Sequence, residues 1–265
     1  MDLGLTDARV LVTGGASNIG RGIVHGFARE GSRIVLCDID GEQAEKVADE
    51  AIAQGAKEVL LAIGDLTEPD APARAVATAV DAWGGVDCLV NNAGWSVPGF
   101  LAHDTDRDRW QRLVEVNLYS SIATTQAALA PMCANGSGSI VFVSSDAAFG
   151  QIRQAVYGAT KAAVVALART TAKEFGRKGI RSNIVCPGLV IPEGPEAIGT
   201  KSLWAGGENT VFDDRQTEFM ISGTPLRRLT TAEDVANSVV WLSSERAARQ
   251  VTGQMFSVSG GYTMP

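Results

Sequence analysis

Tyr157 and Lys161 carry the side chains of this sequence that best suit proton transfer. They stand four residues apart in the alanine-rich stretch SSDAAFGQIRQAVYGATKAA (144–163), so a helix would place them on one face. A tyrosine phenol has a pKa of about 10 and is a poor acid or base at neutral pH, but a nearby ammonium lowers that pKa. The pair therefore predicts a tyrosine general acid/base supported by a lysine. A surface helix could carry the same pair by chance, so the surrounding elements must decide.

Short β-branched runs alternate with longer helical patterns along the chain, which is typical of a parallel sheet covered on both faces. The pattern predicts one α/β domain over residues 1–265, a doubly wound parallel seven-stranded sheet of the Rossmann type. An irregular stretch, 189–224, is too long for a plain connection and is predicted to form a substrate lid. The strands are expected at 8–15, 33–38, 58–65, 86–94, 138–145, 180–188 and 254–258, and the helices at 19–31, 41–55, 68–83, 105–133, 154–176 and 231–243.

The stretch TGGASNIG (13–20) lies between the first expected strand and the first expected helix. Glycines there let the backbone turn tightly and approach a pyrophosphate, which the free N–H groups and positive dipole end of the helix attract. The second strand ends in Asp38, whose carboxylate can accept hydrogen bonds from adenosine ribose hydroxyls and would repel a 2′-phosphate. Asp38 therefore favours NAD over NADP. The alternative is that Asp38 only caps the following turn or helix, as Asp40 could also do.

Composition excludes several other classes of protein. The net charge is −7, from 23 basic and 30 acidic residues, which argues against a nucleic-acid partner. The N-terminus lacks a secretory signal and no apolar run reaches the roughly 20 residues of a membrane span, so we expect a cytoplasmic protein without a membrane partner. His25 and His103 have no ligand spacing to another His or Cys, so no metal is expected.

Taken together, TGxxxxIG, Asp38, NNAG (91–94), VNLYS (116–120), YxxxK and CPG (186–188) resemble the short-chain dehydrogenase/reductase family over essentially the whole chain. The resemblance implies hydride transfer between a secondary alcohol and NAD. Tyr157 would be the general acid/base, Lys161 would bind the nicotinamide ribose and lower the tyrosine pKa, and Asn117 would organise a water-linked proton relay. The cofactor-binding residues that the resemblance implies are Gly14, Ser17, Asn18, Ile19, Gly20, Asp38, Asp65, Leu66, Asn91, Ala93, Gly94, Tyr157, Lys161, Pro187, Gly188 and Val190.

Two positions depart from the family pattern. Asn18 stands where glycine is usual, a mild change because asparagine tolerates unusual backbone angles. Pro192 stands where a threonine often holds the nicotinamide carboxamide, and its ring cannot donate a hydrogen bond. The backbone of Val190 is the expected substitute.

The resemblance leaves two candidates for the serine that orients the substrate oxygen. The commonest spacing to Tyr157 selects Ser144, whereas aligning the end of the strand IVFVSS selects Ser145. We choose Ser145, because the end of a strand is a firmer point of alignment than the number of residues in the loop that follows it. We expect Ser144 to be structural.

The sequence says less about the substrate. The motifs NNAGW, SDAA and VCPG resemble those of 2-hydroxycyclohexanecarbonyl-CoA dehydrogenases and 3-oxoacyl reductases, which favours a cyclic or hydroxyacyl secondary alcohol. The alternatives are a 3-oxoacyl-ACP or 3-oxoacyl-CoA reductase, for which RDRWQR and GRKGIR offer local basic patches, and a non-catalytic nucleotide-binding regulator. Relatives imply a homotetramer. The expected pocket residues are Trp95, Phe149, Gln151, Arg153 and Trp204.

Overall fold

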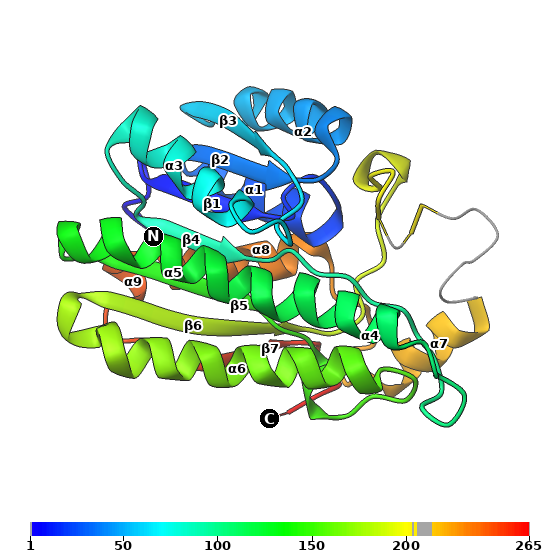
Figure 1. The fold of residues 1–265 in the computed structure, drawn as a ribbon. Helices are drawn as coiled ribbons and strands as arrows, with labels where there is room; N and C mark the ends of the chain where they lie inside the picture. The colour runs from blue at the N-terminus through cyan, green and yellow to red at the C-terminus, as the bar shows by residue number, and fades with distance from the viewer. Residues whose placement is uncertain (1, 203, 206–213, 265) are drawn as a thin grey trace.

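A computed structural model describes residues 2–202, 204–205 and 214–264 (Figure 1). The seven predicted strands form one sheet in the order β3-β2-β1-β4-β5-β6-β7, and every neighbouring pair is parallel. The predicted Rossmann-type sheet is therefore confirmed. The strands are β1 (Arg9–Thr13), β2 (Arg33–Asp38), β3 (Glu58–Ile63), β4 (Cys88–Asn91), β5 (Gly138–Val143), β6 (Ile180–Pro187) and β7 (Met255–Val258).

Two helical layers cover the sheet because alternate residues of each strand point to opposite faces. Val10 and Val12 of β1 pack into the core on the side of α1, α2 and α8, whereas Leu11 packs into the core on the side of α3, α5 and α6. Figure 1 shows α3, α5 and α6 in front of the sheet with α1 and α8 behind it. These helices are α1 (Asn18–Arg29), α2 (Gly41–Ala53), α3 (Ala71–Trp83), α5 (Ser120–Asn135), α6 (Ala155–Phe175) and α8 (Ala232–Ser243).

The helix predicted over 105–133 is not regular. It begins as α4 (Arg107–Val114), passes through one π-helical stretch, η1 (Glu115–Tyr119), and continues as α5. Single π-helical turns inside α-helices often lie at functional sites, and this one contains Asn117.

The stretch 189–224, predicted to be irregular, contains the 3₁₀ turn η4 (Pro195–Ala197) and the helix α7 (Asp214–Gly223). Three further short elements were not predicted: the 3₁₀ turns η2 (Asp146–Phe149) and η3 (Gly176–Lys178) and the helix α9 (Glu245–Ala248). Over the described ranges, the structure contains no helix of sufficient length and apolarity to span a bilayer.

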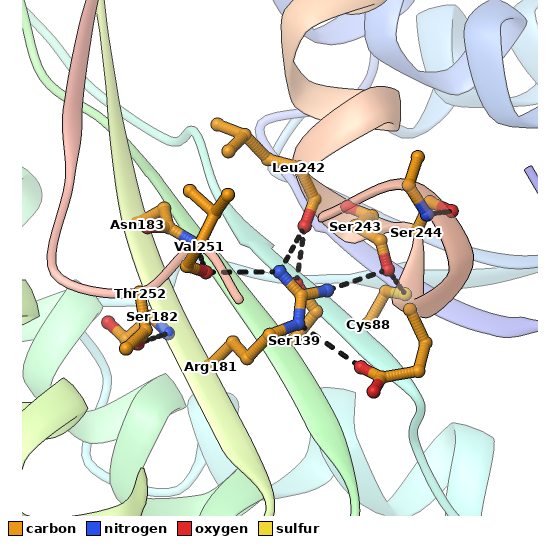
Figure 2. A network of polar contacts seen from close by, with 12 residues as sticks. Cys88, Ser139, Arg181, Ser182, Asn183, Leu242, Ser243, Ser244, Val251 and Thr252 are labelled. Atoms are coloured by element: carbon orange, nitrogen blue, oxygen red, sulfur yellow. Dashed lines mark hydrogen bonds and ion pairs between the residues drawn. The ribbon is translucent and has the colours of Figure 1, made fainter. Parts of the chain in front are cut away.

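A buried arginine joins the sheet to the end of α8, at the edge where β4, β5 and β6 begin (Figure 2). Arg181 of β6 is 6% exposed, and its guanidinium donates to the carbonyls of Leu242 at 2.7 Å, Ser243 at 3.2 Å and Val251 at 3.4 Å. The last carbonyls of a helix have no partner within the helix, and a cation satisfies them well. Arg181 therefore fixes the C-terminus of α8 against the sheet.

Candidate active site

A cavity of about 560 Å³ lies at the carboxyl edge of the sheet. Strand order reverses between β1 and β4, and open α/β sheets bind ligands at this reversal. The cavity is lined by the turn after β1, the ends of β2, β4, β5 and β6, and residues of the stretch 189–224. The fold therefore brings the predicted glycine turn and the predicted Tyr157–Lys161 pair to one place.

The glycine turn has the geometry of a phosphate cradle. Gly14 has a φ of 63°, which glycine adopts without strain, and a Cβ on Gly20 would lie 1.8 Å from the Gly14 carbonyl oxygen. Ser17 precedes the first turn of α1, and its hydroxyl makes no capping bond, so backbone N–H groups of that turn stay available. These residues fit the pyrophosphate of a dinucleotide.

Asn18 adopts the unusual backbone angle that its position requires, with a φ of 43°. Its amide Nδ2 donates to the Val190 carbonyl at 3.2 Å, whereas its Oδ1 is buried and has no partner among the described residues. Asn18 thus joins the glycine turn to the start of the lid. Val190 lines the cavity as predicted. Its backbone carbonyl, however, already accepts the hydrogen bond from Asn18.

Asp38 lies at the end of β2 with both carboxylate oxygens engaged by backbone groups. Oδ2 accepts from the Ala16 N–H at 2.9 Å and Oδ1 accepts from the Asp40 N–H at 3.0 Å. Burial raises its pKa above the ordinary value, and these hydrogen bonds oppose that rise. Asp40 caps α2 by accepting from the Gln43 N–H at 3.2 Å. Asp38 therefore shapes the turn as well as lining the cavity, while Asp40 takes the helix cap.

At the opposite end of the cavity, the Ser145 hydroxyl lies close enough to the Tyr157 phenol to lower its pKa, and both residues line the cavity. Ser145 lies two residues after β5 and caps η2 by accepting from the Ala147 N–H at 3.1 Å, which orients its side chain. The Ser144 hydroxyl instead donates to the Lys161 carbonyl at 2.8 Å and is 3% exposed. The geometry thus places Ser145 beside the tyrosine and gives Ser144 a structural bond.

Lys161 lies beneath the phenol. Its Nζ is 5.7 Å from the centre of the Tyr157 ring and donates to the Val143 carbonyl at 2.9 Å. Burial raises the pKa of Tyr157 to about 12, although the nearby Ser145 hydroxyl opposes the rise, and burial lowers the pKa of Lys161 to about 8. In the protein alone the pKa of Tyr157 therefore lies above its ordinary value, in the direction opposite to the predicted lowering, and loss of hydration is the largest cause.

Asn117 is fully buried in the π-helical stretch and does not line the cavity. Its Oδ1 accepts from the Trp95 N–H at 3.0 Å, and its Nδ2 donates to the carbonyls of Trp95 at 2.7 Å and Leu113 at 2.9 Å. Asn117 therefore holds the loop after β4, which carries the cavity wall at Trp95.

Asn91 does not line the cavity either. It is the last residue of β4, and its Nδ2 donates to the Thr125 hydroxyl of α5 at 3.0 Å. Its neighbour Asn92 lines the cavity and donates to the Gly14 carbonyl at 2.8 Å. Successive residues of an extended chain point to opposite sides. Asn91 therefore points toward α5, whereas Asn92, the next residue, points toward the cavity. Sequence reasoning missed Asn92 for this reason.

The part of the cavity that follows β3 contains an ion pair that sequence reasoning also missed. Arg112 of α4 donates to Asp65 at 2.7 Å and to the Thr67 hydroxyl at 2.8 Å. Burial raises the pKa of Asp65, but these bonds outweigh it, so the pKa lies below its ordinary value. Leu66 and Arg112 both line the cavity.

Sixteen of the eighteen predicted catalytic and cofactor residues line this one cavity, which leaves Asn91 and Asn117 outside it. Those lining it are Gly14, Ser17, Asn18, Ile19, Gly20, Asp38, Asp65, Leu66, Ala93, Gly94, Ser145, Tyr157, Lys161, Pro187, Gly188 and Val190. Of the expected substrate contacts, Trp95, Gln151 and Trp204 line it, whereas Phe149 and Arg153 do not. The guanidinium of Arg153 instead lies over the Phe100 ring, 5.5 Å from its centre.

Asp146 follows Ser145 and is 7% exposed, and neither carboxylate oxygen has a well-formed hydrogen bond with a described residue. Burial raises its pKa from 3.8 to about 6, opposed by the nearby Thr263 hydroxyl. The folded protein thus binds this proton more tightly than the unfolded chain does. The resulting stabilisation is complete below pH 3.8 and is lost as the pH rises through 6.

We therefore expect the free energy of unfolding of the wild type to fall by about 2 kcal/mol relative to that of Asp146→Asn when the pH rises from 4 to 7. Urea unfolding of both proteins at several pH values measures this difference in the free energy of unfolding. Parallel pH profiles for the two proteins would show that Asp146 is ionised normally in the folded state.

A phosphate cradle at the N-terminus of α1 and a serine–tyrosine–lysine cluster at the far end of the same cavity define a dinucleotide-dependent dehydrogenase of the Rossmann class. Comparisons with known proteins agree with this class. Residues 14–263 match the model of a family described as enoyl-(acyl carrier protein) reductase.

Relatives and solved structures match the chain over nearly its whole length. A (2S)-[(R)-hydroxy(phenyl)methyl]succinyl-CoA dehydrogenase subunit, BbsD of Thauera aromatica, is 33% identical and covers 99% of both chains. The cis-4-hydroxycyclohexanecarboxylate dehydrogenase of Sinomonas cyclohexanicum is 35% identical, with 96% of this chain and 95% of the relative covered. A Beutenbergia cavernae structure, described as an NAD(P)-dependent gluconate 5-dehydrogenase with NADP at low occupancy, has a TM-score of 0.85 at 33% identity and covers 99% of each chain.

The chain belongs to the short-chain dehydrogenase/reductase family. It is an oxidoreductase that acts on CH–OH groups and uses NAD(P) as its cofactor.

Proposed function

We propose that this protein oxidises a cyclic or hydroxyacyl secondary alcohol to the ketone with NAD, and that Tyr157 is its general acid/base. The observation that carries the proposal is the grouping of Ser145, Tyr157 and Lys161 in one cavity with the phosphate cradle, with the Lys161 Nζ 5.7 Å from the centre of the Tyr157 ring. When bound, the oxidised cofactor accepts the hydride and brings a positive charge that favours the phenolate.

In this proposal, each residue has a separate task. The Ser145 hydroxyl orients the substrate oxygen, and the Tyr157 phenol takes the hydroxyl proton. Lys161 supplies the nearby positive charge and binds the nicotinamide ribose. Asn117 acts through the loop after β4, since its side chain is fully bonded to the backbone of Trp95 and Leu113.

Apolar side chains near the reacting end support an alcohol with a ring or an acyl chain. Trp95, Met220 and Tyr262 line the same cavity as Tyr157. Two of the relatives reported above are named as dehydrogenases of a hydroxyacyl-CoA compound and of a hydroxycyclohexanecarboxylate. A panel of cyclic alcohols, hydroxyacyl thioesters and their ketones, assayed with NAD(H) and NADP(H), tests the proposal. Turnover of enoyl or 3-oxoacyl thioesters alone would contradict the proposal. It would favour the reductase function in the description of the matching family.

The preference for NAD is supported by Asp38, because a carboxylate at the ribose end repels a 2′-phosphate. We expect Asp38→Asn to raise the ratio of kcat/KM with NADP to kcat/KM with NAD by about tenfold. Asn removes the charge and keeps the side-chain size. Asp49→Asn, on the exposed side of α2, is the matched control. An unchanged ratio would show that Asp38 serves the turn alone.

We also propose that the protein works in the cytoplasm as a homotetramer. The four cysteines are unpaired, which suits a reducing compartment. Tyr119 of η1 and Ile122 of α5 are 59% and 39% exposed. Exposed apolar side chains of this kind suit a surface between subunits.

A further inference from the structure

We propose that residues 195–202 of the lid, named here the docked segment, form a wall of the cofactor site at its adenosine end and bring Lys201 to a phosphate of the dinucleotide. This inference rests on the proposed function only in requiring that the cavity binds a dinucleotide. It assigns a cofactor-binding task to a segment that the sequence predicted to cover substrate.

The docked segment is held at two points on the N-terminus of α2. Oδ2 of Asp40 accepts from the Thr200 N–H at 2.6 Å and from the Thr200 hydroxyl at 2.8 Å. The Gln43 amide donates to the Glu196 carbonyl at 2.7 Å. Asp40 and Gln43 are each 7% exposed, so both contacts are shielded from solvent.

Close packing requires a small residue between these two points. A Cβ on Gly199 would lie 3.0 Å from Oδ2 of Asp40 and 3.6 Å from the Cβ of Ser17. The docked segment therefore lies directly against both the α2 cap and the turn that cradles phosphate. Gly199, Lys201 and Ser202 line the cavity together with Asp38 and Asp40.

The Asp40 carboxylate stays charged in this arrangement. Burial raises its pKa, but hydrogen bonds from Thr200, from the Gln43 N–H and from the Lys201 backbone outweigh the effect, so the pKa lies below its ordinary value. An ionised acceptor makes stronger hydrogen bonds than a neutral one. The contact between the lid and α2 is therefore stable at neutral pH.

Lys201 is the cation at this end of the cavity whose side-chain ammonium has no ion pair or hydrogen bond with any described residue. Arg112 is engaged by Asp65, and Lys161 lies at the reacting end. A dinucleotide brings two pyrophosphate charges to the cavity, and NADP adds a 2′-phosphate. A lysine ammonium on a flexible stem can reach either as a point charge.

The first experiment measures cofactor affinity without substrate. Wild type, Lys201→Met and Lys178→Met are titrated with NADH and with NADPH, using the fluorescence of the bound nicotinamide. Lys178 is an exposed lysine outside the cavity and serves as the control. We expect Lys201→Met to weaken binding by about tenfold and the control to bind as the wild type does.

The two cofactors distinguish the source of the phosphate. Equal weakening for NADH and NADPH assigns Lys201 to the pyrophosphate, and weakening for NADPH alone assigns it to the 2′-phosphate. Unchanged affinity for both cofactors would overturn the proposal. A wild type that binds neither cofactor would refute the proposed function itself, so the two failures can be told apart.

The second experiment tests the docking contacts as positioning residues. Thr200→Val removes the hydroxyl bond to Asp40, and Gln43→Met removes the bond to Glu196, while the α2 cap is kept. We expect the double variant to release NADH about tenfold faster in stopped-flow displacement, with an unchanged melting temperature without cofactor. Thr78→Val, on the exposed face of α3, is the control. Release at the wild-type rate would show that the docked segment does not enclose the cofactor.

Discussion

Replacing Tyr157 by phenylalanine is expected to lower kcat for alcohol oxidation by about 10²- to 10⁴-fold, the usual contribution of a positioned proton acceptor. The ring keeps its packing, because phenylalanine differs only by the hydroxyl that lies close to Ser145. Nothing at the phosphate cradle changes, so the affinity for NADH should remain within about threefold of the wild type. Steady-state kinetics on the best substrate of the panel, with NADH titration, measures both quantities.

The matched control is Tyr119→Phe, because Tyr119 is 59% exposed in the π-helical stretch and lies outside the cavity. It should retain the activity of the wild type. If Tyr157→Phe keeps more than about a tenth of kcat, proton transfer belongs to another group or to water. Loss of NADH binding together with kcat would instead show that the phenol mainly supports the cofactor.

The sequence predicts the fold and most of the cavity because both follow from local patterns. Apolar strands alternating with amphipathic helices dictate a covered parallel sheet, and the sheet brings its carboxyl ends to one edge. The turn at 13–20, Asp38 and the Tyr157–Lys161 pair all stand at such ends or on the helix beside them. Their meeting in space is a consequence of topology.

Other features depend on information that a local pattern does not carry. Asn91 and Asn92 are identical residue types, and only the register of β4 decides which one faces the cavity. The π-helical stretch has no distinct sequence pattern. The sequence therefore suggested a proton relay for Asn117 but not its hydrogen bonds with the Trp95 backbone. The contact of Thr200 with Asp40 joins residues 160 positions apart.

The pKa values of the reacting pair illustrate a further limit. The spacing of Tyr157 and Lys161 predicts attraction between their charged forms, but it says nothing of how deeply both groups are buried. In the structure burial raises the pKa of Tyr157 to about 12 and lowers that of Lys161 to about 8. Both shifts favour the neutral forms, the opposite of what the spacing of the pair predicts.

The largest expected effect on stability comes from Arg181, at the edge of the sheet opposite the cavity (Figure 2). Arg181→Met should lower the free energy of unfolding by about 3 kcal/mol, because buried hydrogen bonds from a charged donor are lost and the carbonyls remain in place. For a chain of this size, the melting temperature should fall by roughly 6–12 °C. Calorimetry or urea unfolding measures the change.

Glu245→Gln is the control that separates the buried contacts of Arg181 from its ion pair. Glu245 is 75% exposed, and its pair with Arg181 at 3.2 Å should contribute less than about 1 kcal/mol. Ser139 and Asn183 also donate to the Leu242 and Val251 carbonyls. If Arg181→Met unfolds like the control, these two donors satisfy the Leu242 and Val251 carbonyls without the arginine. If Arg181→Met has a lower free energy of unfolding while its folded form keeps the wild-type kcat, Arg181 stabilises the fold that positions the site and does not take part in the chemistry.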